Sequence, residues 1–335
     1  MKGMDKMLIL NEEELQSFYT IEDAIIDVEN ALLADRKGRI DNPIRTVIDI
    51  EEQSASSVYM PSASKTENKA AVKVVTIFPN NPKQGKPTTQ GIIVLSDMEN
   101  GEHLAVISAT YLTKLRTGAV SGIATKHLAR KNASSVAVIG TGGMAYDQLS
   151  AVLAVRDIYQ VYLYNRTTER AESFKKTVLE KHPLLEGKIE VVSTAEIAVE
   201  QSSIVICSTR SETPVFDGKV LKPGTHINGV GSYLPHMIEV DLETIAKSSK
   251  IVVDTIEGVQ HEAGELIHAA NATDWTFDDV YAEVSELVAG EKVGRESEEE
   301  ITFFKCVGTG YFDLAVAIGA YNKAKELGIG QVVEI

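Results

Sequence analysis

Cysteine is scarce in this chain of 335 residues, which contains two, Cys207 and Cys306. They lie far apart, each within an apolar stretch, and neither belongs to a CxxC pair or to a spacing typical of metal ligands. We therefore expect two buried thiols, no disulfide and no metal site. This pattern is typical of a reducing compartment.

Long apolar runs and an excess of positive charge are also missing. No apolar segment approaches the roughly 20 residues of a membrane-spanning helix, and the opening MKGMDKMLIL lacks the apolar region of a signal peptide. We expect a cytoplasmic protein with no membrane partner. The 33 lysines and arginines are outnumbered by 48 aspartates and glutamates, which gives a formal net charge of −15. Such an acidic surface repels nucleic acid, so no nucleic-acid partner is expected.

The most informative stretch that is present is Ser135 to Ala145, SVAVIGTGGMA. An apolar strand runs into Gly140-x-Gly142-x-x-Ala145, and the pattern of Tyr146 to Arg156 predicts a helix after it. In this arrangement Gly140 allows a tight turn, Gly142 lets the backbone approach a pyrophosphate, and Ala145 lets helix and strand pack closely. The helix N-terminus then offers N–H groups to the phosphates. The motif predicts dinucleotide binding.

A second apolar run, Gln160 to Tyr164, follows this helix and leads into Asn165, Arg166 and Thr167. An acidic residue near this point would bind the ribose 2′-hydroxyl of NAD, and no acid is present. An arginine beside threonines instead suits the 2′-phosphate of NADP. We therefore predict NADP(H) in preference to NAD(H). The alternative is a solvated arginine in a strand-to-helix turn in which a threonine caps the helix.

Strand and helix patterns alternate through the middle of the chain. Strands are predicted at Ile189 to Val192, Ser203 to Cys207, Thr225 to Asn228 and Ile251 to Asp254, with helices at Thr194 to Gln201 and Asp241 to Lys247. This alternation is typical of a doubly wound parallel sheet. The acidic run Glu296 to Glu300 is interpreted as a solvated helix start. The fold class expected here is α/β of the Rossmann type.

The first part of the chain is dominated by short strands instead. They are predicted at Val47 to Ile50, Ser57 to Met60, Ala70 to Phe78, Ile92 to Ser96 and His103 to Ile107, with a strand and a helix start within Leu8 to Leu15. Asn100-Gly101 is a strong hairpin signal between the last two. Helices are predicted at Thr20 to Gly38, Ala109 to Arg130 and Gly308 to Leu327. We predict a mostly antiparallel α+β domain, 1–130 with 305–335, for substrate binding and dimerisation, and an NAD(P)-binding domain at 131–304.

Three cations of the first domain are candidates for a substrate site. A hydride-transfer enzyme needs charges that fix its substrate and a proton donor or acceptor. Lys73 lies within the apolar strand AAVKVVTIF, where a lysine is costly unless it points outward or meets an anion. Arg45 and Arg116 stand beside threonines, and each could bind a carboxylate through two hydrogen bonds. Taken alone, none of the three is a stronger candidate than an ordinary surface cation, and for Lys73 a strand lysine that points to solvent would normally be the favoured interpretation.

Five ordered stretches of the chain form a recognisable set. They are VKVVTIFPNNP around Lys73, GKPTTQGIIVLSD (Gly85 to Asp97), LTKLRTGAVSGIATKHLA (Leu112 to Ala129), the glycine turn, and FKCVGTGYFDLAVA (Phe304 to Ala317). This set resembles the ornithine cyclodeaminase and mu-crystallin family. Its members are NAD(P)-dependent enzymes acting on amino acids or cyclic imino acids, including cyclodeaminases, archaeal-type alanine dehydrogenases, ketimine reductases and reductases of Δ1-pyrroline-2-carboxylate. The resemblance implies an oxidoreductase acting on CH–NH or C=N groups, and a homodimer paired through its strand domains.

The resemblance also implies roles for individual residues. Arg45, Lys73 and Arg116 would surround the substrate carboxylate, Thr88 would also bind the substrate, and Lys73 would transfer a proton. The implied cofactor contacts are Thr117, Gly140, Thr141, Gly142, Gly143, Met144, Ala145, Asn165, Arg166, Thr167, Ser208, Val230 and Gly308. The Asn-Arg-Thr stretch at 165–167 resembles that of NADP-dependent members, in agreement with the charge argument.

One position departs from the cyclodeaminases of this family, which carry an aspartate in the loop after the strand at Thr225 to Asn228. Here the loop reads GVGSYLPHMIEVD, and the matching position holds Tyr233. A phenol with an ordinary pKa of about 10 cannot replace a carboxylate at neutral pH, and Asp241 is read as a helix N-cap. We therefore predict reduction of a small 2-imino acid, such as Δ1-pyrroline-2-carboxylate, by NAD(P)H. The alternatives are an ornithine cyclodeaminase, an alanine-type amino-acid dehydrogenase, and an NADPH- or small-ligand-binding protein with little turnover.

Overall fold

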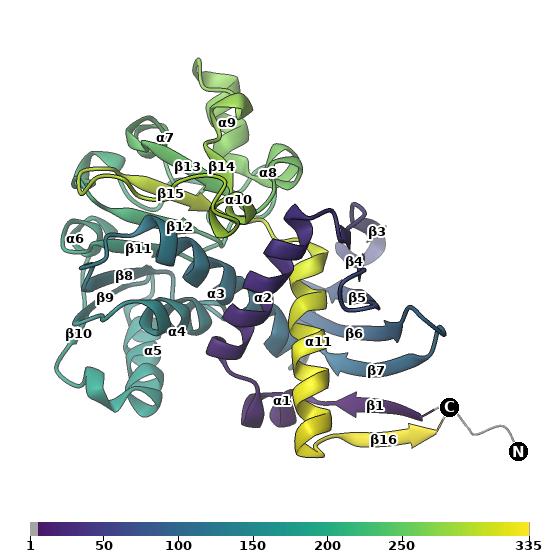
Figure 1. Cartoon of the computed structure of the whole chain (residues 1–335). Coiled ribbons are helices and arrows are strands. Elements are labelled where there is room, and N and C mark those ends of the chain that lie inside the picture. Colours follow the sequence, from purple (N-terminus) through teal and green to yellow (C-terminus); the bar gives the residue numbers. More distant parts are fainter. Residues whose placement is uncertain (1–5, 335) are drawn as a thin grey trace, which may run out of the picture. The chain divides into compact units, whose positions relative to one another are not determined.

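The chain folds into two compact units, each with its own eight-stranded sheet (Figure 1). The computed structural model describes residues 6–334. The antiparallel unit comprises Met1–Arg116 and Thr309–Ile335, and the parallel unit comprises Thr117–Gly308. The chain passes from the first unit to the second within one helix, α3 (Ala109–Leu128).

The antiparallel unit is built from a strand meander and two long helices. Its strands are β1 (Lys6–Leu10), β2 (Ile40–Asp41), β3 (Thr46–Ile50), β4 (Ala55–Ser64), β5 (Lys69–Ile77), β6 (Thr89–Asp97), β7 (His103–Ser108) and β16 (Gln331–Glu334). Its helices are α1 (Glu12–Phe18), α2 (Ile21–Arg36) and α11 (Gly310–Leu327), with short 3-10 turns η1 (Glu51–Gln53) and η2 (Asn81–Gln84). The sheet order is β16-β1-β7-β6-β5-β4-β2, with β3 also paired to β4, and β1–β7 is its parallel pair.

Strand alternation gives this sheet one covered and one half-exposed face. Lys73 pairs with Met60 on β4 and Ile93 on β6, and this face packs against α11, which in turn packs against α2 (Figure 1). The helix α2 begins with a capping box, in which Thr20 and Asp23 exchange hydrogen bonds. The predicted hairpin is also present, and its Gly101 has a φ of 81°, which glycine adopts without strain.

The parallel unit is a doubly wound sheet, as predicted. Its strands are β8 (Ser135–Ile139), β9 (Gln160–Tyr164), β10 (Ile189–Val191), β11 (Ile204–Cys207), β12 (His226–Gly229), β13 (Lys250–Val253), β14 (Ala282–Glu283) and β15 (Thr302–Lys305). Its helices, besides the rest of α3, are α4 (Ala145–Val155), α5 (Thr168–Lys181), α6 (Ala195–Glu200), α7 (Leu242–Lys247), α8 (Ile256–Glu262), α9 (Gly264–Ala272) and α10 (Val284–Val288), with the turns η3 (Pro183–Leu185), η4 (Gly218–Val220) and η5 (Phe277–Asp279).

The order of these strands is β10-β9-β8-β11-β12-β15-β13-β14, and every pair is parallel. Apolar side chains on both faces explain this, because a parallel sheet is covered on both sides. Val136 and Val138 belong to one core cluster, and Ala137 and Ile139 belong to the other. The first six strands follow the order of a Rossmann fold, which reverses between β8 and β11.

Two expectations about local structure have clear outcomes. Cys207 and Cys306 are buried free thiols, as predicted. The helix start predicted at Glu296 to Glu300 is wrong, because this segment forms a turn before β15. The Glu300 carboxylate accepts hydrogen bonds from the backbone N–H groups of Glu296 and Ser297 and lies 3.4 Å from Lys250 Nζ, which fixes the turn. None of the helices within residues 6–334 combines the length and the apolar character that a bilayer crossing needs.

Candidate active site

Lys73 is buried in the antiparallel unit, on the covered face of β5. Its exposed fraction is 3%, so the alternative of a solvent-facing strand lysine is wrong. The strand places it there because Ala71, two positions earlier, shares the same buried face. A lysine in such a place needs an anion.

Asp313, on the first turn of α11, is that anion. Its Oδ2 lies 2.6 Å from Lys73 Nζ, and its Oδ1 lies 3.3 Å from Arg116 Nε. Asp313 is 1% exposed and Arg116 is 7% exposed, so water screens neither contact strongly. Sequence reasoning missed the role of Asp313, although it lies within the stretch FKCVGTGYFDLAVA. No spacing reports a contact between a strand and a helix 240 residues apart.

Burial and charge together shift the titration of this cluster. The pKa of Lys73 is lowered to about 8, mainly by burial; the charges of Arg116 and Arg45 act in the same direction, and Asp313 opposes them. Burial alone would raise the pKa of Asp313, but the neighbouring Arg116 and Lys73 outweigh it and the pKa is lowered. Asp313 is therefore ionised at neutral pH, while Lys73 can gain and lose a proton near it.

The other two predicted substrate residues lie in loops of the same unit. Arg45 is half-buried between β2 and β3, close enough for its charge to act on Lys73. Thr88 is half-buried just before β6, and its carbonyl accepts a hydrogen bond from Phe78 N at 2.7 Å. The structure thus groups Lys73 and Arg116 around Asp313, with Arg45 near Lys73, and it records no such link for Thr88 among the described residues.

This group can bind an anion and move a proton. With Lys73 protonated it contains three cations, of which one is balanced by Asp313. The remaining positive charge favours a carboxylate, and an arginine can hold it through two hydrogen bonds. The ammonium of Lys73, with a pKa of about 8, can donate its proton to a basic atom beside that carboxylate.

The glycine turn lies at the carboxyl end of β8 in the parallel unit. Gly140 has a φ of 88°, and a Cβ there would lie 2.6 Å from Thr209 Cγ2, so the chain itself requires this glycine. Gly142 is different, because its φ is not positive and a Cβ there would meet nothing within 4 Å among the described residues. Its lack of a side chain leaves room at the N-terminus of α4 for a bound group, and a pyrophosphate fits this position.

Asn165 connects this turn to the end of β9. Its Oδ1 accepts a hydrogen bond from Thr141 N at 3.2 Å, and its Nδ2 donates to Thr167 O at 3.0 Å. Thr167 occupies the N-cap position of α5 but makes no side-chain cap hydrogen bond to that helix. The alternative in which this threonine serves as a helix cap therefore lacks its hydrogen bond. Arg166 is exposed at the tip of the turn.

The remaining predicted cofactor residues also belong to the parallel unit, at two kinds of position. Ser208 and Val230 directly follow β11 and β12, and Gly308 follows β15 by three residues. Ser208 Oγ donates a hydrogen bond to Gly140 O at 2.8 Å, and Gly308 N donates to buried Asp254 at 2.6 Å. These three lie at the carboxyl edge of the sheet, where open α/β folds bind ligands. Thr117 is buried within α3.

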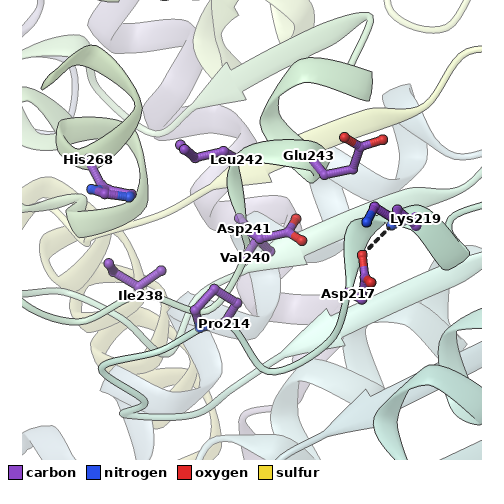
Figure 2. Close-up of a pocket in the computed structure, with 9 residues that line it drawn as sticks. All are labelled: Pro214, Asp217, Lys219, Ile238, Val240, Asp241, Leu242, Glu243 and His268. Atoms are coloured by element: carbon purple, nitrogen blue, oxygen red, sulfur yellow. Dashed lines mark hydrogen bonds between the residues drawn. The ribbon is translucent and has the colours of Figure 1, made fainter. Parts of the chain in front are cut away.

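Tyr233 and Asp241 lie in the loop after β12. The Tyr233 ring is half-buried, and the guanidinium of Arg210 lies 5.9 Å from its centroid. Asp241 caps α7 as predicted, since its Oδ1 accepts a hydrogen bond from Thr244 N at 2.8 Å. A cavity of about 470 Å³ lies beside Asp241 and is lined by Pro214, Asp217, Lys219, Ile238, Val240, Asp241, Leu242, Glu243 and His268 (Figure 2). Asp217 caps the turn η4 by accepting a hydrogen bond from Lys219 N. Both aspartates of this cavity therefore bind backbone N–H groups, and neither is a candidate ligand-binding group.

The strand order and the glycine turn, together with the buried lysine and arginine, define an oxidoreductase that uses a nicotinamide dinucleotide. The chain belongs to the ornithine cyclodeaminase/mu-crystallin family, whose model matches residues 5–328. The resemblance seen in the sequence is therefore confirmed.

Three relatives show the range of activities near this chain. It is 41% identical over 329 residues, 98% of this chain and 100% of the relative, to Δ1-pyrroline-2-carboxylate reductase of Bacillus cereus (strain ZK / E33L). Among solved structures, Δ1-pyrroline-2-carboxylate reductase of Thermococcus litoralis in complex with NADH and L-proline superposes with a TM-score of 0.92 at 39% identity, covering 97% of this chain and 99% of that one. An archaeal alanine dehydrogenase dimer with bound NAD gives a TM-score of 0.90 at 35% identity, covering 98% and 99%.

Proposed function

We propose that this protein reduces Δ1-pyrroline-2-carboxylate to proline with a reduced nicotinamide cofactor. The observation that carries the proposal is the buried cluster of Lys73, Asp313 and Arg116, whose charges suit a carboxylate and whose lysine can give up a proton near neutral pH. The similarity over nearly the full length to two Δ1-pyrroline-2-carboxylate reductases supports the choice of substrate.

In this mechanism the residues of the antiparallel unit hold the imino acid. Arg116 and Arg45 bind its carboxylate, and Lys73 donates a hydrogen bond to the imine nitrogen. When bound, the reduced nicotinamide supplies the hydride that the C=N carbon accepts. Lys73 gives its proton to the nitrogen, and Asp313 stays ionised, which lowers the cost of the charged lysine in a buried place. A proton from solvent then restores Lys73.

For the cofactor, NADP(H) is preferred to NAD(H). The end of β9 has no carboxylate that would bind a ribose 2′-hydroxyl and repel a 2′-phosphate. Arg166 is exposed at the tip of the turn that follows. The next residue, Thr167, has a hydroxyl that makes no cap hydrogen bond to α5. A guanidinium and a hydroxyl are suitable donors to a phosphate.

The protein is a homodimer that pairs the outer face of its antiparallel sheet. Tyr59, Val72, Val74, Ile92 and Val94 are cross-strand neighbours on the face opposite Lys73. Ile92 is 45% exposed, and an apolar sheet face of this kind is typical of a protein interface. The alanine dehydrogenase with which this chain superposes is a dimer.

The substrate is tested by comparing three reactions of the purified protein. NADPH and NADH oxidation is measured with Δ1-pyrroline-2-carboxylate and with pyruvate plus ammonia, and release of ammonia from ornithine is measured in the presence of NAD, because a cyclodeaminase returns its hydride to the product and leaves no net NADH. We expect fast oxidation with the cyclic imine alone, faster with NADPH. Activity confined to pyruvate and ammonia would identify an amino-acid dehydrogenase. Activity confined to ornithine would identify a cyclodeaminase and overturn the argument from Tyr233.

A further inference from the structure

A second buried charge cluster lies beneath the carboxyl edge of the parallel sheet. The register aligns Ile139, Cys207, Gly229 and Lys305 in one row across β8, β11, β12 and β15. Lys305 and Glu265 have no exposed side-chain surface, and Lys305 Nζ lies 2.9 Å from Glu265 Oε1. Lys305 Nζ also donates a hydrogen bond to Ser232 O at 2.7 Å. This pair fixes the loop after β12 from below.

Glu239, fully buried beside this pair, holds two loops at once. Its Oε1 accepts hydrogen bonds from Thr209 N at 2.6 Å and Thr209 Oγ1 at 2.9 Å, in the loop after β11. Its Oε2 accepts from Gly231 N at 2.8 Å and Ser232 N at 3.1 Å, in the loop after β12. All four donors belong to segments that directly follow neighbouring strands. One carboxylate therefore sets the position of both loops.

Close backbone packing shows that these two loops are fitted to each other. A Cβ placed on Gly231 would lie 2.1 Å from both the N and the O of Thr209, so only glycine fits there. Burying a carboxylate is expensive: burial raises the pKa of Glu239, although Lys305 and the bonds from Thr209 offset part of this effect. A neutral hydrophobic contact would join two loops at lower cost, so the arrangement favours a role that needs a defined geometry.

We propose that Glu239 is a positioning residue that aligns the loops after β11 and β12 with the nicotinamide half of the cofactor. This inference rests on the proposed function. A Rossmann fold binds its dinucleotide across the point where the strand order reverses, here between β8 and β11. The glycine turn and Asn165 lie on the β8–β9 side and suit the adenosine half. The nicotinamide half is therefore expected on the β11–β12 side. There Glu239 binds Thr209 and Gly231, the residues that directly follow Ser208 and Val230 in the chain.

Besides its contacts with Ser208 and Thr209, the glycine turn has anchors of its own that do not involve Glu239, which makes the two halves separable by experiment. Gly140 N donates a hydrogen bond to Tyr164 O at 2.9 Å, and Thr141 N donates to Asn165. Both acceptors lie at the end of β9, away from the β11–β12 loops in the strand order. A loss of order in those loops should thus weaken binding of the adenosine diphosphate part much less than binding of the nicotinamide part.

The variant that tests this is Glu239→Gln in the full-length protein. Glutamine has the same shape, but its amide NH₂ must face N–H donors on one of the two sides, which releases one loop. Dissociation constants are measured for NADH and for ADP-ribose, which lacks only the nicotinamide ring, together with kcat and KM for the imine. We expect NADH binding to weaken about tenfold or more and kcat to fall, with ADP-ribose affinity within about twofold.

Asp241→Asn is the matched control, because Asp241 also joins two segments by accepting backbone hydrogen bonds, from Thr244 N and from Gly218 N at 2.9 Å. It should leave both affinities unchanged. If Glu239→Gln lowers the two affinities equally, or changes neither, the inference is wrong. If Glu239→Gln does not fold, Thr209→Val and Thr209→Ser replace it, since the first removes the hydroxyl that donates to Glu239 and the second keeps it. Thr209→Val must then weaken NADH but not ADP-ribose, and equal behaviour of the two variants would overturn the inference.

The same measurements separate this inference from the proposed function. Wild-type protein that binds NADH but does not reduce the imine would refute the proposed substrate, while the affinity ratio still decides the role of Glu239. Wild-type protein that reduces the imine, together with a Glu239→Gln variant of unchanged ratio, would refute the role of Glu239 alone.

Discussion

We predict that the ion pair between Asp313 and Lys73 sets the pH range in which the protein is active. Lys73 must carry its proton to donate it, so activity is expected below its pKa of about 8 and is lost as the pH rises through that value. Asp313→Asn keeps the shape of the side chain and removes the charge that holds this proton. The pKa of Lys73 should therefore fall, and the alkaline limb of kcat/KM should move to lower pH.

The size of the shift follows from the geometry. Two unit charges at about 4 Å interact by about 4 kcal/mol at an effective dielectric constant of about 20, and asparagine keeps part of the contact as a hydrogen bond, so a fall on the order of two pKa units is expected. Lys73 would then be about three quarters protonated at pH 7.5 in the wild type and about 3% protonated in the variant. We predict a loss of kcat/KM on the order of 25-fold at pH 7.5 and little loss near pH 5.5.

The assay is kcat/KM for the cyclic imine from pH 5 to 10, with Asp23→Asn as control. Asp23 likewise pairs with a lysine, since it lies 2.6 Å from Lys323. Lys323 is on α11, further along that helix than Asp313, and Lys73 is on β5, so this second pair is separate from the first. Breaking a buried pair costs about 3–5 kcal/mol of stability, so the thermal unfolding of each variant is recorded as well. A folded Asp313→Asn variant whose activity falls equally at every pH, with the alkaline limb unmoved, would refute the reasoning.

Three further variants test separate parts of the account. Arg166→Asp should weaken NADPH binding about 10- to 100-fold and spare NADH, because it removes the phosphate partner and adds a repelling charge; equal losses for both cofactors in titrations would contradict the predicted preference. Gly142→Val should abolish cofactor binding while the melting temperature stays near that of the wild type, since a Cβ there has free space within the chain; a variant that still binds NADPH would contradict the pyrophosphate position. Ile92→Lys should convert the predicted dimer to a monomer in sedimentation equilibrium, because it places a charge on the apolar sheet face; a wild-type monomer would contradict the predicted dimer outright.

Much of the fold could be predicted from the sequence because its signals are local. Alternating apolar runs and the Asn-Gly turn indicated the strands of the antiparallel unit, and Gly140-x-Gly142 indicated the start of the doubly wound sheet. The strand β15 (Thr302–Lys305) was missed, since four residues with polar ends have no clear period. The run Glu296 to Glu300 was misread because its conformation depends on a distant lysine, Lys250, rather than on its own composition.

The residues of the candidate site also differ in whether the sequence could reveal them. Lys73 stood out as a charge inside an apolar strand, but whether it met solvent or an anion depended on α11, which the pattern alone could not place. Asp313 and Glu239 carried no signal of their own, because an acid in a helix or a loop is most often solvated. Their partners, Lys73 and Thr209, became known only when the chain was folded.

The most direct test of the account is the proline formed for each NADPH consumed, measured with Δ1-pyrroline-2-carboxylate for the wild type and for Lys73→Ala. The wild type is expected to form proline in an amount equal to the NADPH consumed. Lys73→Ala should bind NADPH with unchanged affinity and form proline orders of magnitude more slowly. Wild-type protein that consumes NADPH without forming proline, or a Lys73→Ala variant with near-normal turnover, would contradict it.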